Sequence, residues 1–150
     1  MLTSQPKLCN HGCTMSDQLS TDLIERYLAL VADLDADPAE LDRFVHPDAR
    51  FVERPCLVSP RGRERDREET RAGFARSRTR LASQRIDVRD HIVAGDRVVT
   101  RAVWSATLAQ DAGPLPAGTE LRADCSMFFT LRDGLIAAQE NFDCYHPVAA

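Results

Sequence analysis

The chain has 150 residues, of which 43% are apolar and 28% charged, with a net charge of -4. This size and composition predict one soluble globular domain with a real core. The charge argues against nucleic acid as a partner, and no apolar run approaches the roughly 20 residues of a membrane span. The first sixteen residues lack the apolar segment of a signal peptide, so we expect a cytoplasmic protein.

Five cysteines are spread over the chain. In the cytoplasm we expect them as free thiols, and Cys125 and Cys144 fall in predicted strands, where each would pack as a small core residue. The segment from Cys9 to Cys13 offers two thiols and an imidazole, but no further ligands complete a metal site. We therefore expect no metal and assign residues 1–19 to a flexible tail, with Met15 as an alternative start.

The first predicted helix spans residues 22–34. Asp22 caps it and Glu25 completes a capping box. Tyr27 lies within its wide apolar stripe. Because a buried tyrosine hydroxyl needs a partner, Tyr27 either reaches a backbone carbonyl or points into a cavity, and the residues alone favour the carbonyl.

Two more helices are predicted before the main strands. A short one begins at Asp37 and Pro38, the cap and first position typical of a helix start. A third covers residues 63–81 and is charged along most of its length, with Phe74 and Leu81 as its packing residues. We expect it to lie solvated over the sheet. Its arginines could instead contact an anionic substrate or partner, an alternative that the sequence favours less.

Alternating apolar and polar residues predict a short strand and then four antiparallel strands. In these strands Asp90 falls on an apolar side, and Arg101 would be costly to bury unless paired, with Asp90 or Asp143 as its partner. The last strand starts apolar and ends in carboxylates and amides, so it leads from a core to water or to a polar cavity. Helices followed by an antiparallel sheet predict an α+β fold. The strands span residues 49–53, 84–93, 98–108, 121–132 and 135–144.

Three segments, 23–27, 44–55 and 129–136, resemble the nuclear transport factor 2-like superfamily. Within it the chain is most similar to SnoaL-like polyketide cyclases and small bacterial relatives of ketosteroid isomerase. The resemblance covers residues 20–147 and leaves 148–150 as a tail. It implies a cone-shaped fold, in which a curved, mostly antiparallel sheet is wrapped by the three N-terminal helices around a deep pocket.

The resemblance also assigns the residues of a site. Tyr27 stands where ketosteroid isomerases have their oxyanion-hole tyrosine, and Asp143, beside Asn141, stands where SnoaL-like relatives carry a pocket acid. The isomerase base position holds Arg54 and its oxyanion-hole acid position holds Met127, so the steroid reaction itself is not expected. The implied catalytic residues are Asp143, Tyr27, Asn141 and Arg101, and the implied substrate-binding residues are Gln139, Phe51, Phe74, Met127, Phe129 and Val103.

In such a pocket Asp143 would abstract a proton beside a carbonyl. Tyr27 or Asn141 would then donate a hydrogen bond to the enolate oxygen, and no cofactor would be needed. The resemblance therefore implies a cyclase or isomerase acting on an apolar, carbonyl-bearing, polyketide-like small molecule.

The alternative is a non-catalytic ligand-binding or dimerisation domain of the same fold, which the missing isomerase carboxylates favour. An enzyme needs Asp143 close to another polar group in a closed cavity, whereas a binding protein tolerates it solvated at the rim. In either case we expect a homodimer. If Arg101 faces the cone, Trp104 faces outward beside Phe128, and such apolar patches mark interfaces.

Overall fold

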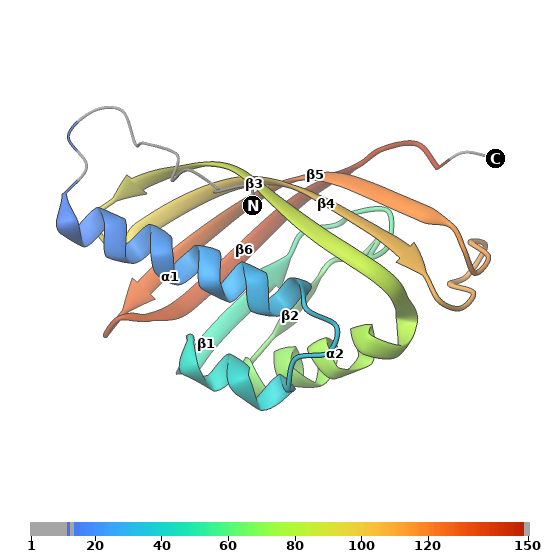
Figure 1. Ribbon diagram of the computed structural model, residues 1–150, viewed down its shortest axis with the longest axis horizontal. Helices are drawn as coiled ribbons and strands as arrows, with labels where there is room; N and C mark the ends of the chain where they lie inside the picture. Colours follow the sequence, from blue (N-terminus) through green and yellow to red (C-terminus); the bar gives the residue numbers. More distant parts are fainter. Residues whose placement is uncertain (1–11, 13, 149–150) are drawn as a thin grey trace, which may run out of the picture.

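The computed structural model describes Gly12 and residues 14–148. Within these residues two α-helices and a 3₁₀ helix accompany one six-stranded sheet (Figure 1). The sheet has the strand order β2-β1-β6-β5-β4-β3, and only β1 and β6 pair in parallel. The elements are α1 (Met15–Ala32), η1 (Pro38–Arg43), β1 (Val45–Glu53), β2 (Arg63–Arg65), α2 (Arg67–Arg80), β3 (Leu81–Ala94), β4 (Arg97–Leu108), β5 (Glu120–Arg132) and β6 (Leu135–Tyr145).

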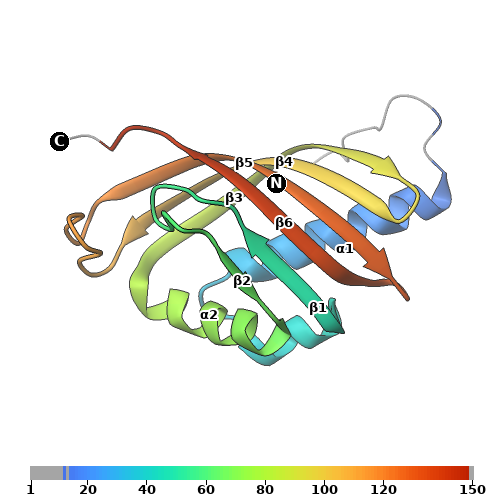
Figure 2. The same ribbon diagram turned by 180° about the vertical axis from the view of Figure 1, so that it is seen from behind.

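The sheet is curved, and α1 lies across one of its faces (Figure 1). Seen from behind, β6 crosses in front of α1, and no helix of the described residues covers the outer face of β4, β5 and β6 (Figure 2). The predicted α+β cone with a mostly antiparallel sheet is confirmed. No helix in the described part of the chain combines the length and apolar character needed to cross a membrane.

The first helix starts seven residues earlier than predicted, at Met15. Thr14 accepts a hydrogen bond from the Asp17 backbone N–H, and the Asp17 carboxylate accepts one from the Thr14 N–H, so this pair forms the capping box instead of Asp22 and Glu25. The added turns expose Met15, so the apolar periodicity of the core-facing stripe gives no sign of them. The expected boundary at residue 20 therefore falls inside α1.

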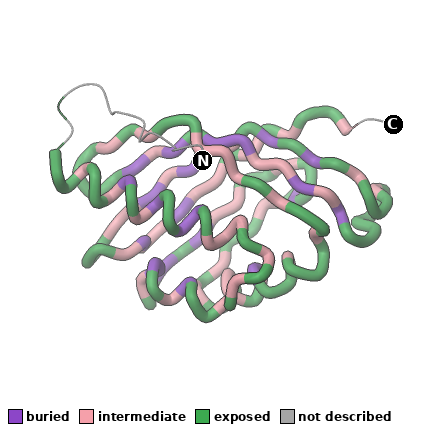
Figure 3. The backbone as a smooth tube through the Cα atoms, in the orientation of Figure 1, coloured by how far each residue is buried: buried purple, intermediate pink, exposed green. Residues whose placement is uncertain are grey.

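Two side chains of β3 tie α1 to the sheet. His91 Nε2 lies 3.1 Å from a carboxylate oxygen of Glu25, and Gln84 Nε2 donates a 2.6 Å hydrogen bond to the Val31 carbonyl oxygen. Both contacts engage polar groups at the edge of the helix and leave its apolar side for the core. Figure 3 shows buried segments on α1 and on the strands it covers.

A β-bulge in β3 explains why Asp90 falls on the apolar side of the sequence pattern. The register with β4 shifts between Val88 and Asp90. The extra residue turns Asp90 and Ile92 outward and brings His91 to the helix-covered face, opposite Thr100. The outer position of Ile92 agrees with its 64% exposed surface.

Two features of the β1 region differ from the expectation. β1 begins at Val45 rather than at residue 49, and its register with β6 is interrupted between Val45 and Arg50, where Pro47 has no N–H for the ladder. The three-residue strand β2 was not predicted, because its sequence, Arg63-Glu64-Arg65, is charged and too short for any periodicity. It pairs with β1 and places Arg65 opposite Phe51.

A glycine pair tests the turn that leads into β2. Gly62 and Gly113 both have a left-handed backbone, with φ of 64° and 58°. A Cβ at Gly62 would lie 2.6 Å from the Glu53 carbonyl oxygen, whereas one at Gly113 would contact nothing within 4 Å. We expect Gly113→Ala to lower the free energy of unfolding by about 1 kcal/mol and Gly62→Ala to lower it by clearly more. Urea unfolding measures both, and equal losses would contradict the close approach at Gly62.

Candidate functional site: a pocket on the concave face

A pocket of about 310 Å³ lies on the concave face, between α1, α2 and the strands β4, β5 and β6. Its polar lining residues are Tyr27, Glu53, Arg65, Ser77, Gln84, Gln139, Asn141 and Asp143. Its other lining residues are Leu28, Val31, Leu81, Ile86, Ala102, Trp104, Ala123, Cys125, Met127 and Tyr145.

Small side chains in the middle of the sheet leave the space for this pocket. Ala102 of β4 pairs with Cys125 of β5, and Ala123 pairs with Trp104. Successive residues of a strand point to opposite faces, so these four side chains share the concave face. Further along β5, the fully buried Phe129 fills the same layer. The pocket therefore lies where the sheet carries small alanine and cysteine side chains instead of large core residues.

A relay of hydrogen bonds crosses the pocket from α1 to β6. The Tyr27 hydroxyl donates a 2.7 Å hydrogen bond to Gln139 Oε1, and Gln139 Nε2 donates a 2.9 Å hydrogen bond to Asn141 Oδ1. The hydroxyl therefore reaches a side chain and not a backbone carbonyl. Asn141 Nδ2 makes no hydrogen bond to any described residue, so the relay leaves one donor at its end, on the pocket wall.

Asp143 follows Asn141 on the same face of β6, opposite Cys125 of β5. Its Oδ1 is shielded from solvent and accepts no hydrogen bond from the described residues. Burial raises the pKa of Asp143 above the usual aspartate range, the Cys125 thiol partly offsets this, and the negative charge of Glu53 raises the pKa further. Asp143 is thus a carboxyl group with an unused acceptor and an increased affinity for a proton.

Two more charged groups reach the pocket from β1 and β2. The Glu53 carboxylate is paired with Arg63, whose Nε lies 2.9 Å from Oε2. Arg65 forms no ion pair with the described residues, and its Nε is shielded from solvent without a hydrogen-bond partner. Burial lowers the pKa of Arg65, while the nearby Glu53 charge raises it.

An aromatic part of the pocket wall is held in place by two contacts. Trp104 Nε1 donates a 3.0 Å hydrogen bond to Gln84 Oε1, and the Trp104 and Tyr145 rings meet edge to face with centroids 5.9 Å apart. Because Gln84 is itself bound to the backbone of α1 at Val31, this wall is fixed to both the sheet and the helix.

Several predicted site residues lie elsewhere. Arg101 is wrongly expected in the pocket: its side chain is 65% exposed on the outer face and forms a bidentate pair with Asp90, at 2.6–3.1 Å. The pairing with Asp90 is one of the two that the sequence predicted. Val103 shares the outer face with Arg101, since Ala102 and Trp104 face the pocket. The predicted walls Phe51, Phe74 and Phe129 are buried core residues that do not line the pocket.

Sequence reasoning missed Glu53, Arg65, Gln84, Trp104, Cys125 and Tyr145. A signal existed for Glu53, which is two residues from the buried Phe51 and so shares its face. Tyr145 continues the alternation of Asn141 and Asp143 in the same way. No signal could have chosen the face of Trp104, because both sides of β4 are apolar, and none could have placed Arg65 in so short a strand.

Cysteine and metal chemistry is limited in the described part of the chain. Cys56, Cys125 and Cys144 are free thiols, but Cys144 is exposed and not the core residue that was predicted. Burial and the Asp143 charge raise the pKa of Cys125, so this thiol is a poor nucleophile at neutral pH. No three histidine, cysteine or acidic side chains of the described residues could share a metal ion, and the segment Cys9 to Cys13 is described only at Gly12.

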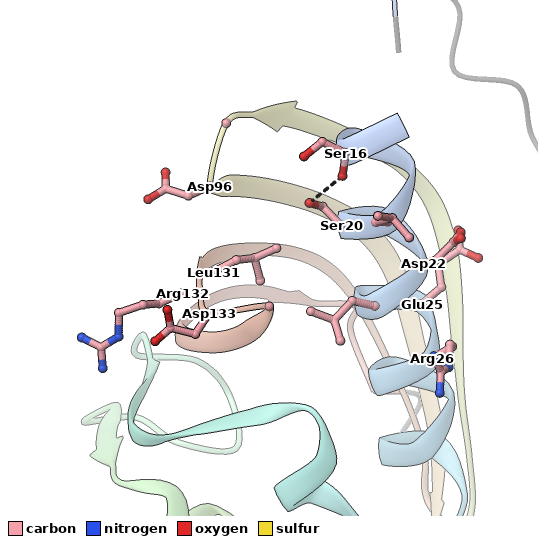
Figure 4. A pocket seen from close by; sticks show the side chains of 13 residues that line it. Ser16, Ser20, Asp22, Glu25, Arg26, Asp96, Leu131, Arg132 and Asp133 are labelled. Atoms are coloured by element: carbon pink, nitrogen blue, oxygen red, sulfur yellow. Dashed lines mark hydrogen bonds between the residues drawn. The ribbon is translucent and has the colours of Figure 1, made fainter. Parts of the chain in front are cut away.

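A second hollow, of about 740 Å³, lies between the start of α1 and the β3–β4 and β5–β6 turns. Figure 4 shows Leu131 pointing toward α1, while Asp96 and Arg132 point away from the helix. The hydrogen bond drawn there, from the Ser20 hydroxyl to the Ser16 carbonyl oxygen, stays within α1. The charged side chains around this second hollow do not point toward one another, so the concave pocket is the better candidate site.

Comparison with solved structures finds the same fold in several proteins. TsrD from Streptomyces laurentii is 24% identical, with 87% of this chain and 91% of that chain covered at a TM-score of 0.69. IdmH from Streptomyces antibioticus, a proposed polyketide cyclase, is 23% identical over 82% and 90% of the two chains, with a TM-score of 0.67. A proposed SnoaL-like polyketide cyclase from Jannaschia sp. CCS1 is 18% identical over 89% and 91%, with a TM-score of 0.73.

No curated protein matches the chain. The family model of the SnoaL-like domain matches residues 24–139. That match extends from α1 to the Gln139 position of β6 and includes most of the pocket. The resemblance seen in the sequence is confirmed, and the chain belongs to the SnoaL-like domain family.

Proposed function

We propose that the protein is a cofactor-independent acid–base catalyst of the cyclase or isomerase type, acting on a small carbonyl-bearing molecule. The observation that carries the proposal is Asp143, a carboxyl group with a solvent-shielded, unused acceptor inside a pocket. A buried acceptor without a partner destabilises a fold, so its retention is explained if a substrate supplies the missing group.

Asp143 acts as the general base in this proposal. Its carboxylate takes a proton from the carbon beside a substrate carbonyl, and a raised pKa brings the group closer to the neutral range in which proton transfer is efficient. The apolar part of the pocket, including Leu28 and Ile86, holds the carbon skeleton and excludes water from the reacting atoms.

Asn141 supplies the hydrogen bond to the enolate oxygen. Sequence reasoning left this role to Tyr27 or Asn141, and the relay favours Asn141, because the Tyr27 hydroxyl is already bound to Gln139. Gln139 in turn holds the Asn141 carbonyl oxygen, which leaves the Asn141 N–H₂ group directed to other partners. A donor fixed before the reaction stabilises developing charge without reorganisation. Tyr27 therefore serves as a positioning residue.

A purely ligand-binding domain of the same fold is the second candidate. Such a domain would tolerate an Asp143 that is solvated at the rim of the pocket. The shielded Oδ1 of Asp143 and the donor on Asn141, two residues away on the same face, favour catalysis instead. The free thiols of Cys56, Cys125 and Cys144 support a reducing compartment, and we retain the cytoplasm as the proposed location.

Replacing the base should remove the reaction. With 2-tetralone as a bicyclic ketone probe in D₂O, we expect wild-type protein to accelerate deuterium exchange at the carbon beside the carbonyl, and Asp143→Asn to lower that rate about 100-fold or more. Proton NMR follows the exchange. Asp124→Asn is the matched control, since Asp124 is an exposed acid at the position just before Cys125 on β5.

The proposed role of Asp143 as the base also predicts a pH dependence. The wild-type exchange rate should fall as pH drops through a midpoint above the ordinary aspartate pKa of about 4, because only the ionised form of Asp143 is a base. Unchanged exchange in Asp143→Asn would exclude this role.

The relay predicts an order of effects. Asn141→Ala should slow the exchange about 100-fold, as the loss of an oxyanion donor does, whereas Tyr27→Phe should slow it less, since it only frees Gln139 to rotate. The same NMR assay compares the two variants, with circular dichroism to verify folding. A larger loss in Tyr27→Phe would show that Tyr27 contacts the substrate directly.

The outer face of the sheet supports a proposed homodimer, on different residues from those expected. Trp104 lines the pocket and is unavailable there. Instead, Phe128 and Phe142 stack edge to face with centroids 5.6 Å apart, and Ile92 and Phe142 are 64% and 44% exposed. Uncovered apolar side chains on one sheet face mark an interface.

Light scattering after size exclusion tests this assembly. We expect a dimer mass at micromolar concentration for the wild type and a monomer for Phe142→Glu, because a charge buried in the interface has no partner. Leu19→Glu is the control, since Leu19 is also an exposed apolar residue but lies on α1, away from the outer face of the sheet. A monomeric wild type would refute the proposed interface.

A further inference from the structure

Arg65 is a half-buried cation on the pocket wall that the proposed mechanism does not use. It lines the pocket, its Nε is shielded from solvent, and no carboxylate of the described residues forms an ion pair with it. Most other arginines on nearby elements are paired: Arg63 with Glu53, Arg67 and Arg71 with Asp42. An unpaired guanidinium is costly to bury, so its place in the pocket requires another explanation.

The helix beside Arg65 is shaped to admit this side chain. Gly73 lies in the middle of α2, and a Cβ there would come within 2.9 Å of Arg65 Nη1. Glycine is among the poorest residues for a helix interior. Its presence at this point lets the guanidinium pass against α2 and reach the pocket.

The charges around Arg65 leave it free for a ligand. Glu53, the acid whose charge most affects the pKa of Arg65, is already paired with Arg63. Asp143 does not compensate Arg65 either, because no ion pair joins them and the influences on the Asp143 carboxyl come from Cys125 and Glu53. The pocket thus presents an unpartnered buried donor and an unpartnered buried acceptor, on Arg65 and Asp143, that do not satisfy each other.

We infer that Arg65 binds a carboxylate on the substrate, so that the ligand is an acidic carbonyl compound and not a neutral ketone or ester. A guanidinium offers two parallel N–H groups whose spacing matches a carboxylate. Arg65 is the one cationic residue among the described residues that line the pocket, so it suits a ligand with one negative charge. The inference deepens the proposed function by naming the substrate class, and it rests on that proposal only in taking this pocket as the functional site.

Two matched probes test the inference without knowledge of the natural substrate. Cyclohexanecarboxylate and cyclohexanecarboxamide have the same apolar ring and nearly the same shape, but only the first is charged. Trp104 is the one tryptophan in the sequence and lies on the pocket wall, so its fluorescence reports occupancy. For the wild type we expect the carboxylate to bind at least ~10-fold more tightly than the carboxamide, since the charged contact is the stronger one.

Arg65→Gln should bring the two affinities to within about twofold, because the amide offers no charge to either probe. Arg97→Gln removes the same charge from an exposed position at the start of β4 and should keep the full preference. Gly73→Ala gives an independent check. Alanine favours the helix but crowds Arg65, so the melting temperature should hold or rise while the carboxylate preference falls.

Three results would overturn the inference. The first is equal affinity of the folded wild type for the two probes. The second is absence of carboxylate binding at ~10 mM, because one charge-assisted contact should give tighter binding than that. The third is a carboxylate preference that survives in Arg65→Gln. Each of them leaves the role of Asp143 standing, because deuterium exchange into 2-tetralone measures that role with a probe that has no carboxylate.

Discussion

The hydrogen bond from Tyr27 to Gln139 joins the first helix to the last strand, and the arrangement of the pocket depends on it. The Tyr27 side chain is 3% exposed, so its hydroxyl must be satisfied inside the protein. The hydroxyl meets this need by donating to Gln139 on the concave face of β6. Once Gln139 accepts that bond, its own N–H₂ group is directed along the strand to Asn141. One buried contact thereby fixes the helix against the sheet and orders the amides beside Asp143.

Around this contact, the pocket has an apolar part and a charged part, and each has its own physical origin. Small residues such as Ala102 and Ala123 leave space in the centre of the sheet, and the large Phe129 closes the layer beyond them. The charged groups Glu53, Arg65 and Asp143 come from the ends of β1, β2 and β6, where strands leave the core. Unsatisfied groups on Asp143 and Arg65 are therefore tolerated at the boundary between core and solvent, where a ligand can reach them. The rigid Trp104 wall limits how such a ligand lies.

The two faces of the sheet divide the work of the protein. The concave face carries the pocket, and the outer face carries the Arg101–Asp90 pair and the exposed aromatic residues. A single extra residue in β3 exchanges the faces of Asp90 and His91. The bulge places the acid where it neutralises Arg101 and the imidazole where it meets Glu25 of α1. The local irregularity thus serves both the outer surface and the attachment of the helix.

The sequence by itself determined the α+β class and the order of the helices and long strands. These follow from periodicity and from local capping and turn chemistry, which act over a few residues. It also indicated the polar end of β6, because alternation puts Asn141 and Asp143 on one face. The face of Arg101 and Trp104 was decided only by the tertiary structure, since β4 is apolar on both sides and its pattern fits either orientation. The same holds for Arg65, which reaches the pocket through the pairing of β2 with β1 and the absent side chain of Gly73, contacts between segments that no local pattern records.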